Sequence, residues 1–175
     1  MTVPGPDAAA DLFGLLLTFA GTAVGDVWEA RMVIEPPAVR MLASSATAVE
    51  LEELDEELAH LRSVFDDPPA FSSAGARFHI KLVELSGNRT LAAVIGMLSE
   101  IVERELTKTL ADKGPETDTI RKANKRAMRG YEKIVEVIRS GDGERAEQAW
   151  REHMQSARRY LNNSKDEARV VDLLY

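Results

Sequence analysis

Apolar residues recur every three or four positions along almost the whole chain, which is the period of one face of an α-helix. No segment alternates apolar and polar residues as a half-buried strand does, and no Asn-Gly or Asp-Gly pair joins two β-rich runs. The sequence therefore predicts an all-α protein, an antiparallel bundle of about six or seven helices with short loops. The expected helices span residues 12–19, 26–43, 47–65, 70–86, 90–111, 117–139 and 142–161.

Several residues mark the expected helix boundaries. Thr47 and Glu50 match a capping box, in which the hydroxyl and the carboxylate each satisfy a free backbone N–H group. Asp26 is placed to cap the second helix, and Gly87 is a C-terminal stop for the fourth. Pro36-Pro37 predicts a kink or break inside the second helix, because proline removes a backbone donor and clashes with the preceding turn.

The chain carries a net charge of -7 and contains no cysteine. Non-specific DNA binding needs lysine and arginine to neutralise phosphates, so an acidic chain is poorly suited to it. Without cysteine there are neither disulfides nor thiolate zinc sites, which fits a reducing cytoplasm. The longest apolar run, residues 12–23, is too short to span a bilayer and follows no charged segment. We therefore expect a cytoplasmic protein without membrane contact.

At 175 residues, a single domain is the simplest expectation. Residues 1–23 are expected to form a flexible lead-in, up to residue 10, and a short helix that stops near Gly21. Residues 24–175 are expected to form the helical domain, with residues 170–174 as a last short helix or a docking tail.

Two histidines, His79 and His153, lie within apolar helical patterns. An imidazole on the inner face of a bundle is either a hydrogen-bonded core group or a ligand for a metal or small molecule. Helical metal sites normally draw three or four ligands, often spaced four residues apart. Four residues before His79 stands Gly75, which has no side chain to offer.

Basic residues recur on one face of the sixth expected helix. Without interleaved aromatic residues, this stripe is expected to be a solvated helix face rather than a phosphate contact. Its members are Arg121, Lys122, Lys125, Arg126, Arg129 and Lys133.

Three short motifs follow one another along the chain. They are Asp26-Val27-Trp28-Glu29-Ala30-Arg31 with Glu35; Phe78-His79 with Ser86-Gly87-Asn88; and Tyr131-Glu132-Lys133-Ile134 with Ile138, Gly141-Asp142, Ala146 and His153. In order and spacing they resemble the ligand-sensing (FCD) domain of FadR-type GntR transcriptional regulators. The resemblance covers roughly residues 24–161, which is nearly all of the chain.

The resemblance implies an all-helical sensor, usually dimeric, that follows an N-terminal winged helix-turn-helix domain. Many members hold a divalent metal between one aspartate and three histidines, and their ligand is commonly a small carboxylate at the metal; others bind acyl-CoA or other effectors without metal. His79 and His153 match two of the metal histidines. Gly75 stands at the aspartate position and Tyr131 at that of the third histidine.

With two of four ligands replaced, we expect a pocket without a resident metal, although a divalent ion on the two histidines stays an alternative. Tyrosine is a poor metal ligand near pH 7, because its phenol is protonated. Tyr131 is instead expected to donate a hydrogen bond to an effector.

The expected ligand-binding residues are Arg31, His79, Asn88, Tyr131 and His153. For two of them an alternative stays open. Arg31 either holds a carboxylate bidentately or pairs with Glu35 one helical turn away. Asn88 either reaches the effector or caps the following helix.

These observations predict an effector-binding and dimerisation domain of a transcriptional regulator, a homodimer that senses a carboxylate or acyl-type metabolite. The roughly 25 residues before Asp26 are too few for a winged helix-turn-helix, so DNA is expected to be contacted only through a domain absent from this sequence. No nucleophile elbow, phosphate-binding glycine loop or HExxH motif indicates an enzyme. The alternatives are a structural dimerisation module whose pocket is filled by side chains, and a hydrolase with His79 or His153 as base.

Overall fold

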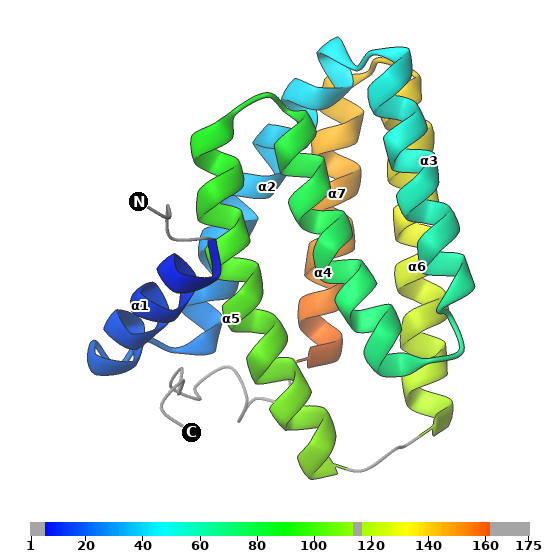
Figure 1. Ribbon diagram of the computed structural model, residues 1–175. Helices are drawn as coiled ribbons and strands as arrows, with labels where there is room; N and C mark the ends of the chain where they lie inside the picture. The colour runs from blue at the N-terminus through cyan, green and yellow to red at the C-terminus, as the bar shows by residue number, and fades with distance from the viewer. Residues whose placement is uncertain (1–5, 114–116, 162–175) are drawn as a thin grey trace.

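The computed structural model describes residues 6–113 and 117–161, and this part of the chain forms seven helices and no strand. The all-α prediction is therefore confirmed. The helices are α1 Pro6–Phe19, α2 Val24–Ser45, α3 Ala48–Ser63, α4 Pro68–Leu85, α5 Arg89–Lys113, α6 Thr117–Arg139 and α7 Gly143–Leu161 (Figure 1). The expected last helix or docking tail at residues 170–174 lies outside the described residues.

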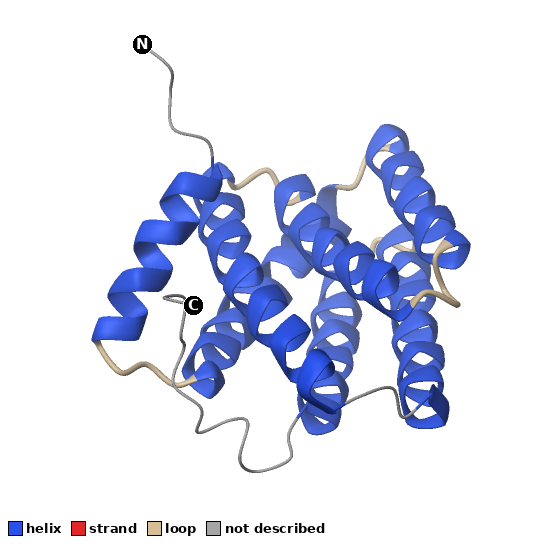
Figure 2. Cartoon of the chain, turned by 60° about the horizontal axis from the view of Figure 1, so that its bottom comes forward, coloured by secondary structure: helices blue, strands red, loops and turns tan. Residues whose placement is uncertain are grey.

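The helices form a bundle in which short loops join α1 through α5 in turn, and α6 to α7 (Figure 2). Helix α2 packs mainly against α7, α4 against α5, and α6 against α7. Helix α1 lies at one side of the bundle, against α5, and exposes Leu12, Leu16 and Phe19. Among the described residues, no helix combines the length and the apolar character that crossing a bilayer requires.

The core is made of the apolar positions that the helical periodicity places inward. Burying such side chains is the main favourable contribution to folding, at about 25 cal/mol per Å² of apolar surface. Its largest fully buried members include Leu42, Leu54, Phe78, Ile95, Ile134 and Trp150. Only four polar or charged residues of the described part are buried with them: Arg31, Glu35, His79 and Ser99.

The predicted capping box at the start of α3 is present. The backbone N–H of Glu50 donates to Thr47 Oγ1 at 3.3 Å, and the backbone N–H of Thr47 donates to Glu50 Oε2 at 2.7 Å. The predicted role of Asp26 is wrong, because α2 begins two residues before it, at Val24. Asp26 instead accepts the backbone N–H of Ala23 from within the first turn.

The predicted break at Pro36-Pro37 is also wrong, because α2 continues through both prolines. Proline at position 36 leaves the carbonyl of Met32 without its usual donor four residues later. That carbonyl accepts instead from Arg151 Nη1 of α7, at 3.4 Å. A donor from a neighbouring helix therefore replaces the backbone donor that the proline removes.

The first helix begins at Pro6, so residues 6–10 are not the flexible lead-in that the sequence led us to expect. Proline suits the first helical position, and three successive alanines, the best helix formers, follow at residues 8–10. Ala10 is buried, which ties this turn to the bundle.

Replacing Thr47 by alanine removes one half of the capping box and is expected to lower the free energy of unfolding by about 1 kcal/mol. Urea denaturation measures this change. Ser45→Ala is the matched control, because the Ser45 hydroxyl only donates back to the Met41 carbonyl of its own helix. An equal loss in both variants would contradict the assignment of the cap.

Candidate functional site

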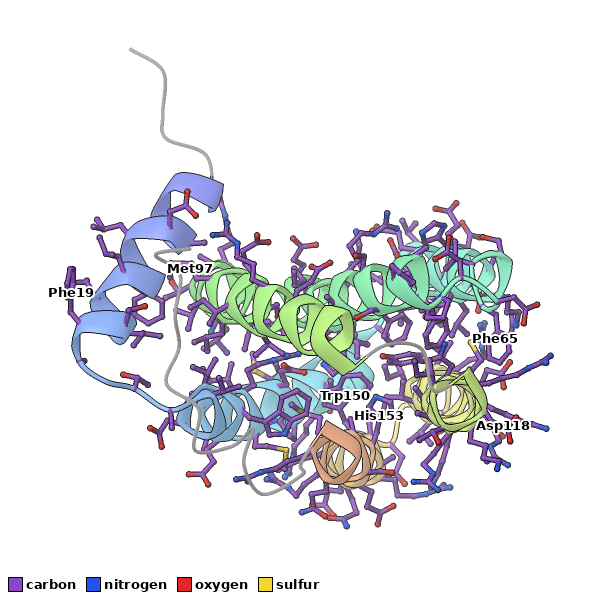
Figure 3. The ribbon with its side chains drawn as sticks, turned by 90° about the horizontal axis from the view of Figure 1, so that it is seen from below. Phe19, Phe65, Met97, Asp118, Trp150 and His153 are labelled. Carbon is purple, nitrogen blue, oxygen red and sulfur yellow. The ribbon has the colours of Figure 1, made fainter. Side chains whose placement is uncertain are left out.

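A cavity of about 350 Å³ lies between α2, α4, α5, α6 and α7. Four of the five residues expected to bind a ligand line it: Arg31, His79, Tyr131 and His153. Figure 3 shows His153, with Trp150, on the inner side of α7 toward the other helices. The structure thus brings together side chains from four helices that are distant in the sequence.

The fifth expected ligand residue, Asn88, is not part of the cavity lining. Its Oδ1 accepts the backbone N–H of Leu91 at 3.1 Å, as a cap at the start of α5 does. The structure therefore supports the capping alternative for Asn88.

A buried carboxylate, Glu35, organises the polar side of the cavity. Arg31 Nε donates to Glu35 Oε1 at 2.6 Å, and Trp150 Nε1 donates to Glu35 Oε2 at 3.0 Å. His79 Nδ1 lies 2.6 Å from the same Oε2. Three donors from α2, α4 and α7 thus converge on one carboxylate that is 0% exposed. The intrahelical pair of Arg31 and Glu35, left open by the sequence, is formed, and it is buried rather than exposed.

The electrostatics of this network determine the tautomer of His79. Burial alone would raise the pKa of Glu35, but the neighbouring Arg31 and His79 outweigh burial and lower the pKa to about 2. Glu35 is therefore ionised near neutral pH and can only accept hydrogen bonds. The 2.6 Å contact consequently places the proton of His79 on Nδ1 and leaves Nε2 with a lone pair.

Both histidines of the cavity are uncharged near neutral pH. Burial lowers the pKa of His79 more than the neighbouring Glu35 raises it. Burial, reinforced by His79, lowers the pKa of His153 to about 3. The His153 ring stacks on Trp150 with centroids 4.7 Å apart and an interplanar angle of 15°, and it also lies 4.7 Å from the Tyr131 ring. Two neutral imidazoles thus line the cavity: His79 is bonded to the Arg31–Glu35 pair, and His153 packs among aromatic rings.

Two glycines make room for the rings of Tyr131 and His153. A Cβ atom on residue 75 would lie 2.8 Å from the hydroxyl oxygen of Tyr131, which is inside van der Waals contact. A Cβ atom on residue 130 would overlap Nδ1 of His153. Gly75 and Tyr131 are therefore coupled, since the phenol occupies the space that a side chain at position 75 would need. Burial also raises the pKa of Tyr131, so its phenol stays protonated.

The donor set of the cavity does not fit a divalent metal. Gly75 supplies no ligand, and Tyr131 keeps its proton. His79 donates from Nδ1 to Glu35 and offers only Nε2, so each cavity histidine supplies at most one ligand atom. Within the described ranges, no group of three or more histidine, aspartate or glutamate side chains is arranged to hold a metal ion. Two imidazoles alone make a weak site for such ions.

Sequence reasoning missed Glu35 and Trp150 as residues of the site. The available signal for Glu35 was its place on the inward face of a helix, four residues after Arg31. The signal for Trp150 was its position three residues before His153, on the same helix face. Neither signal shows that the two side chains meet, because their contact joins helices at opposite ends of the sequence.

The chain is similar to a known protein family in sequence and to a solved structure in fold. The FCD domain family matches residues 26–156, about three quarters of the chain. Among solved structures, the chain is similar to Streptococcus agalactiae GntR, with a TM-score of 0.64 and 18% sequence identity. The likeness covers 78% of this chain and 58% of that one, so the chain spans little more than half of its neighbour. At this identity the likeness shows the fold alone. No curated protein matches the chain in sequence.

The coupling between positions 75 and 131 predicts a non-additive pair of substitutions. Gly75→Ala is expected to lower the free energy of unfolding by roughly 1–3 kcal/mol, because its methyl group meets the Tyr131 hydroxyl. Adding Tyr131→Phe to this variant removes the hydroxyl oxygen and is expected to restore about 1 kcal/mol of the lost free energy of unfolding. A double-mutant cycle by urea denaturation measures the coupling.

Gly96→Ala is the control for this cycle, because no atom lies within 4 Å of a Cβ at that position of α5. It is expected to stabilise the protein by about 0.5–1 kcal/mol, as alanine in an open helical position does. Strict additivity of the two substitutions at positions 75 and 131 would show that the phenol does not occupy this space.

The lowered pKa values predict a loss of stability on acidification. His153 takes up a proton in the unfolded chain below about pH 6.5 but in the folded protein only near pH 3, so the unfolded state binds more protons between these values. Lowering the pH from 7.5 to 5 is therefore expected to lower the free energy of unfolding by about 2 kcal/mol through His153. Glu35 adds a loss in the same direction between about pH 4.5 and 2.

Urea denaturation at pH 7.5, 6 and 5 measures this dependence. His153→Gln is expected to make the free energy of unfolding depend less on pH. His60→Gln, at a position outside the cavity lining, should leave this pH dependence unchanged. A stability that is unchanged between pH 7.5 and 5 in the wild-type chain would rule out neutral buried imidazoles.

Proposed function

The chain belongs to the FCD domain family, and we propose that it is the effector-binding domain of a GntR-type transcriptional regulator, which senses a small organic molecule in its cavity. The observation that carries the proposal is the cavity itself. A purely structural dimerisation module would fill this space with side chains, whereas about 350 Å³ stays open beside His79, Tyr131 and His153. That volume is at the lower end of the range for small-molecule sites.

The proposed sensor works without a metal. Two of the four positions that hold metal in many members of the family are Gly75 and Tyr131 here, and the remaining donors do not fit an ion. The Tyr131 hydroxyl has no hydrogen-bond partner among the described residues, so it is available to donate to a bound molecule. In the proposed site this donor polarises the effector where the metal would otherwise do so.

The position of the cavity supports a route from binding to regulation. Its lining comes from five helices, so a ligand that contacts several of them favours one packing of the bundle over another. In a regulator that pairs as a homodimer, such a shift repositions the attached DNA-binding domains. The effector and the DNA are then coupled through helix packing.

A hydrolase is less well supported. Glu35 orients His79 as a catalytic carboxylate orients a general base, with Nε2 left free. In the described part of the chain, however, no hydroxyl group donates a hydrogen bond to either cavity histidine, so a nucleophile activated by one of them is not in place.

A thermal-shift screen of metabolites, with and without divalent ions and EDTA, tests the proposal. A ligand at about a hundredfold its Kd stabilises the folded state by roughly 2.7 kcal/mol, which corresponds to a Tm increase of several degrees. Hits are expected to be unaffected by EDTA, and protein purified without chelator is expected to contain little divalent metal.

A variant that fills the cavity locates the binding site. Ala127→Leu adds bulk to the cavity wall and is expected to abolish the shift, whereas Ala59→Leu at an exposed position of α3 should keep it. Hits that require a divalent ion would contradict the metal-free site. A chain that no metabolite stabilises would favour the structural module.

A further inference from the structure

The buried cation of the cavity is already neutralised. Among the described residues that line the cavity, Arg31 is the one buried cation, and its Nε lies 2.6 Å from Glu35 Oε1. A carboxylate that entered the cavity would have to draw Arg31 away from Glu35. That change would leave Glu35 as an uncompensated buried charge, which is strongly unfavourable. Arg31 is therefore poorly suited to hold an anionic ligand.

The other charged side chains of the lining are exposed or partly exposed. Lys133 and Glu152 are both exposed and face each other, with Lys133 Nζ 3.9 Å from Glu152 Oε2. Arg126 is exposed as well, and Glu103 accepts a hydrogen bond from Ser73. Solvent screens such exposed charges, so they add little attraction for an anion in the interior.

Three buried polar atoms of the described residues have no hydrogen-bond partner: Trp28 Nε1, Ser99 Oγ and His153 Nε2. All three belong to side chains that line the cavity, and they come from α2, α5 and α7. Trp28 and Ser99 are 6% and 1% exposed, so the protein itself should satisfy them. Buried polar atoms of native proteins almost always have partners. Their gathering at one cavity indicates a ligand that supplies these partners.

The hydrogen-bonding capacity of these three atoms indicates which chemical groups the missing partner carries. The indole of Trp28 only donates, and the hydroxyl of Ser99 donates and accepts. A neutral imidazole offers one donor and one acceptor. None of the three carries a charge, and the rest of the wall is largely apolar, with side chains such as Phe71, Val102 and Ile120.

We infer that the effector is an uncharged, mainly apolar organic molecule with a carbonyl, amide or hydroxyl group, and not a carboxylate. The inference rests on the proposed function, since it names the class of molecule that the same cavity takes. The apolar part of the ligand packs against the wall, and its polar group supplies a hydrogen-bond partner to at least one of Trp28, Ser99 and His153. The Arg31–Glu35 pair stays intact beneath it.

Matched pairs of small probes test this inference on the full chain. Benzamide and benzoate, cinnamamide and cinnamate, and cyclohexanecarboxamide and cyclohexanecarboxylate each share a skeleton and differ in charge. Titration followed by ligand-observed NMR at pH 7.5 measures their Kd values. At least one amide is expected to bind about tenfold more tightly than its carboxylate, and Ala127→Leu is expected to abolish that binding.

Carboxylates that bind more tightly than their amides would overturn the inference, while the proposed sensor would stand. Binding by neither series would also overturn it, and the metabolite screen then decides separately whether the cavity is a sensor. Binding that survives Ala127→Leu would place the probes outside the cavity and overturn the inference, while the metabolite screen still decides on the sensor.

Two substitutions identify the contacts behind the preference. Glu35→Gln leaves Arg31 without its counter-charge, so carboxylate binding is expected to tighten about tenfold while amide binding changes less than about twofold. Glu29→Gln, at an exposed position of the same helix, is the matched control and should change neither. Ser99→Ala is expected to weaken amide binding several-fold. A Glu35→Gln variant that folds and still rejects carboxylates would show that the pair does not exclude them.

Discussion

The buried ion pair of Arg31 and Glu35 determines the chemistry of the cavity. Two charges out of water are costly, and a buried pair is tolerated only when further hydrogen bonds satisfy it. His79 and Trp150 supply those bonds from α4 and α7, so the pair on α2 ties three helices together. Each of the four side chains depends on the others, because the loss of one donor leaves a buried charge only partly satisfied.

The cavity departs at two positions, 75 and 131, from the metal-ligand set that the resemblance of the sequence implies. Glu35 fixes the proton of His79 on Nδ1 and leaves Nε2 as the one free lone pair of that ring. The Tyr131 phenol takes the space beside Gly75 in which an aspartate would stand. The residues at positions 75 and 131 therefore depend on each other. The glycine leaves room for the phenol, and the phenol leaves no room for a longer side chain at position 75.

Helical periodicity and local end signals were enough to predict the all-α bundle, since the capping box at Thr47 and the glycine at position 87 act over a few residues. Contacts between distant helices could not be predicted. An arginine and a glutamate four residues apart look alike in sequence whether exposed or buried, and only the packing of α2 against its neighbouring helices buries them. The break at Pro36 failed as a prediction for the same reason, because its compensating donor, Arg151, lies far along the chain.

Histidine-selective ¹⁵N NMR of the cavity tests the central claim, that Glu35 orients a neutral His79 in a cavity that binds no metal. At pH 7, we expect His79 and His153 both to be neutral and His79 to carry its proton on Nδ1. An equimolar amount of zinc is expected to leave the signals of both side chains unchanged. A proton on Nε2 of His79, an imidazolium at either position, or a zinc-induced shift of both side chains would contradict this claim.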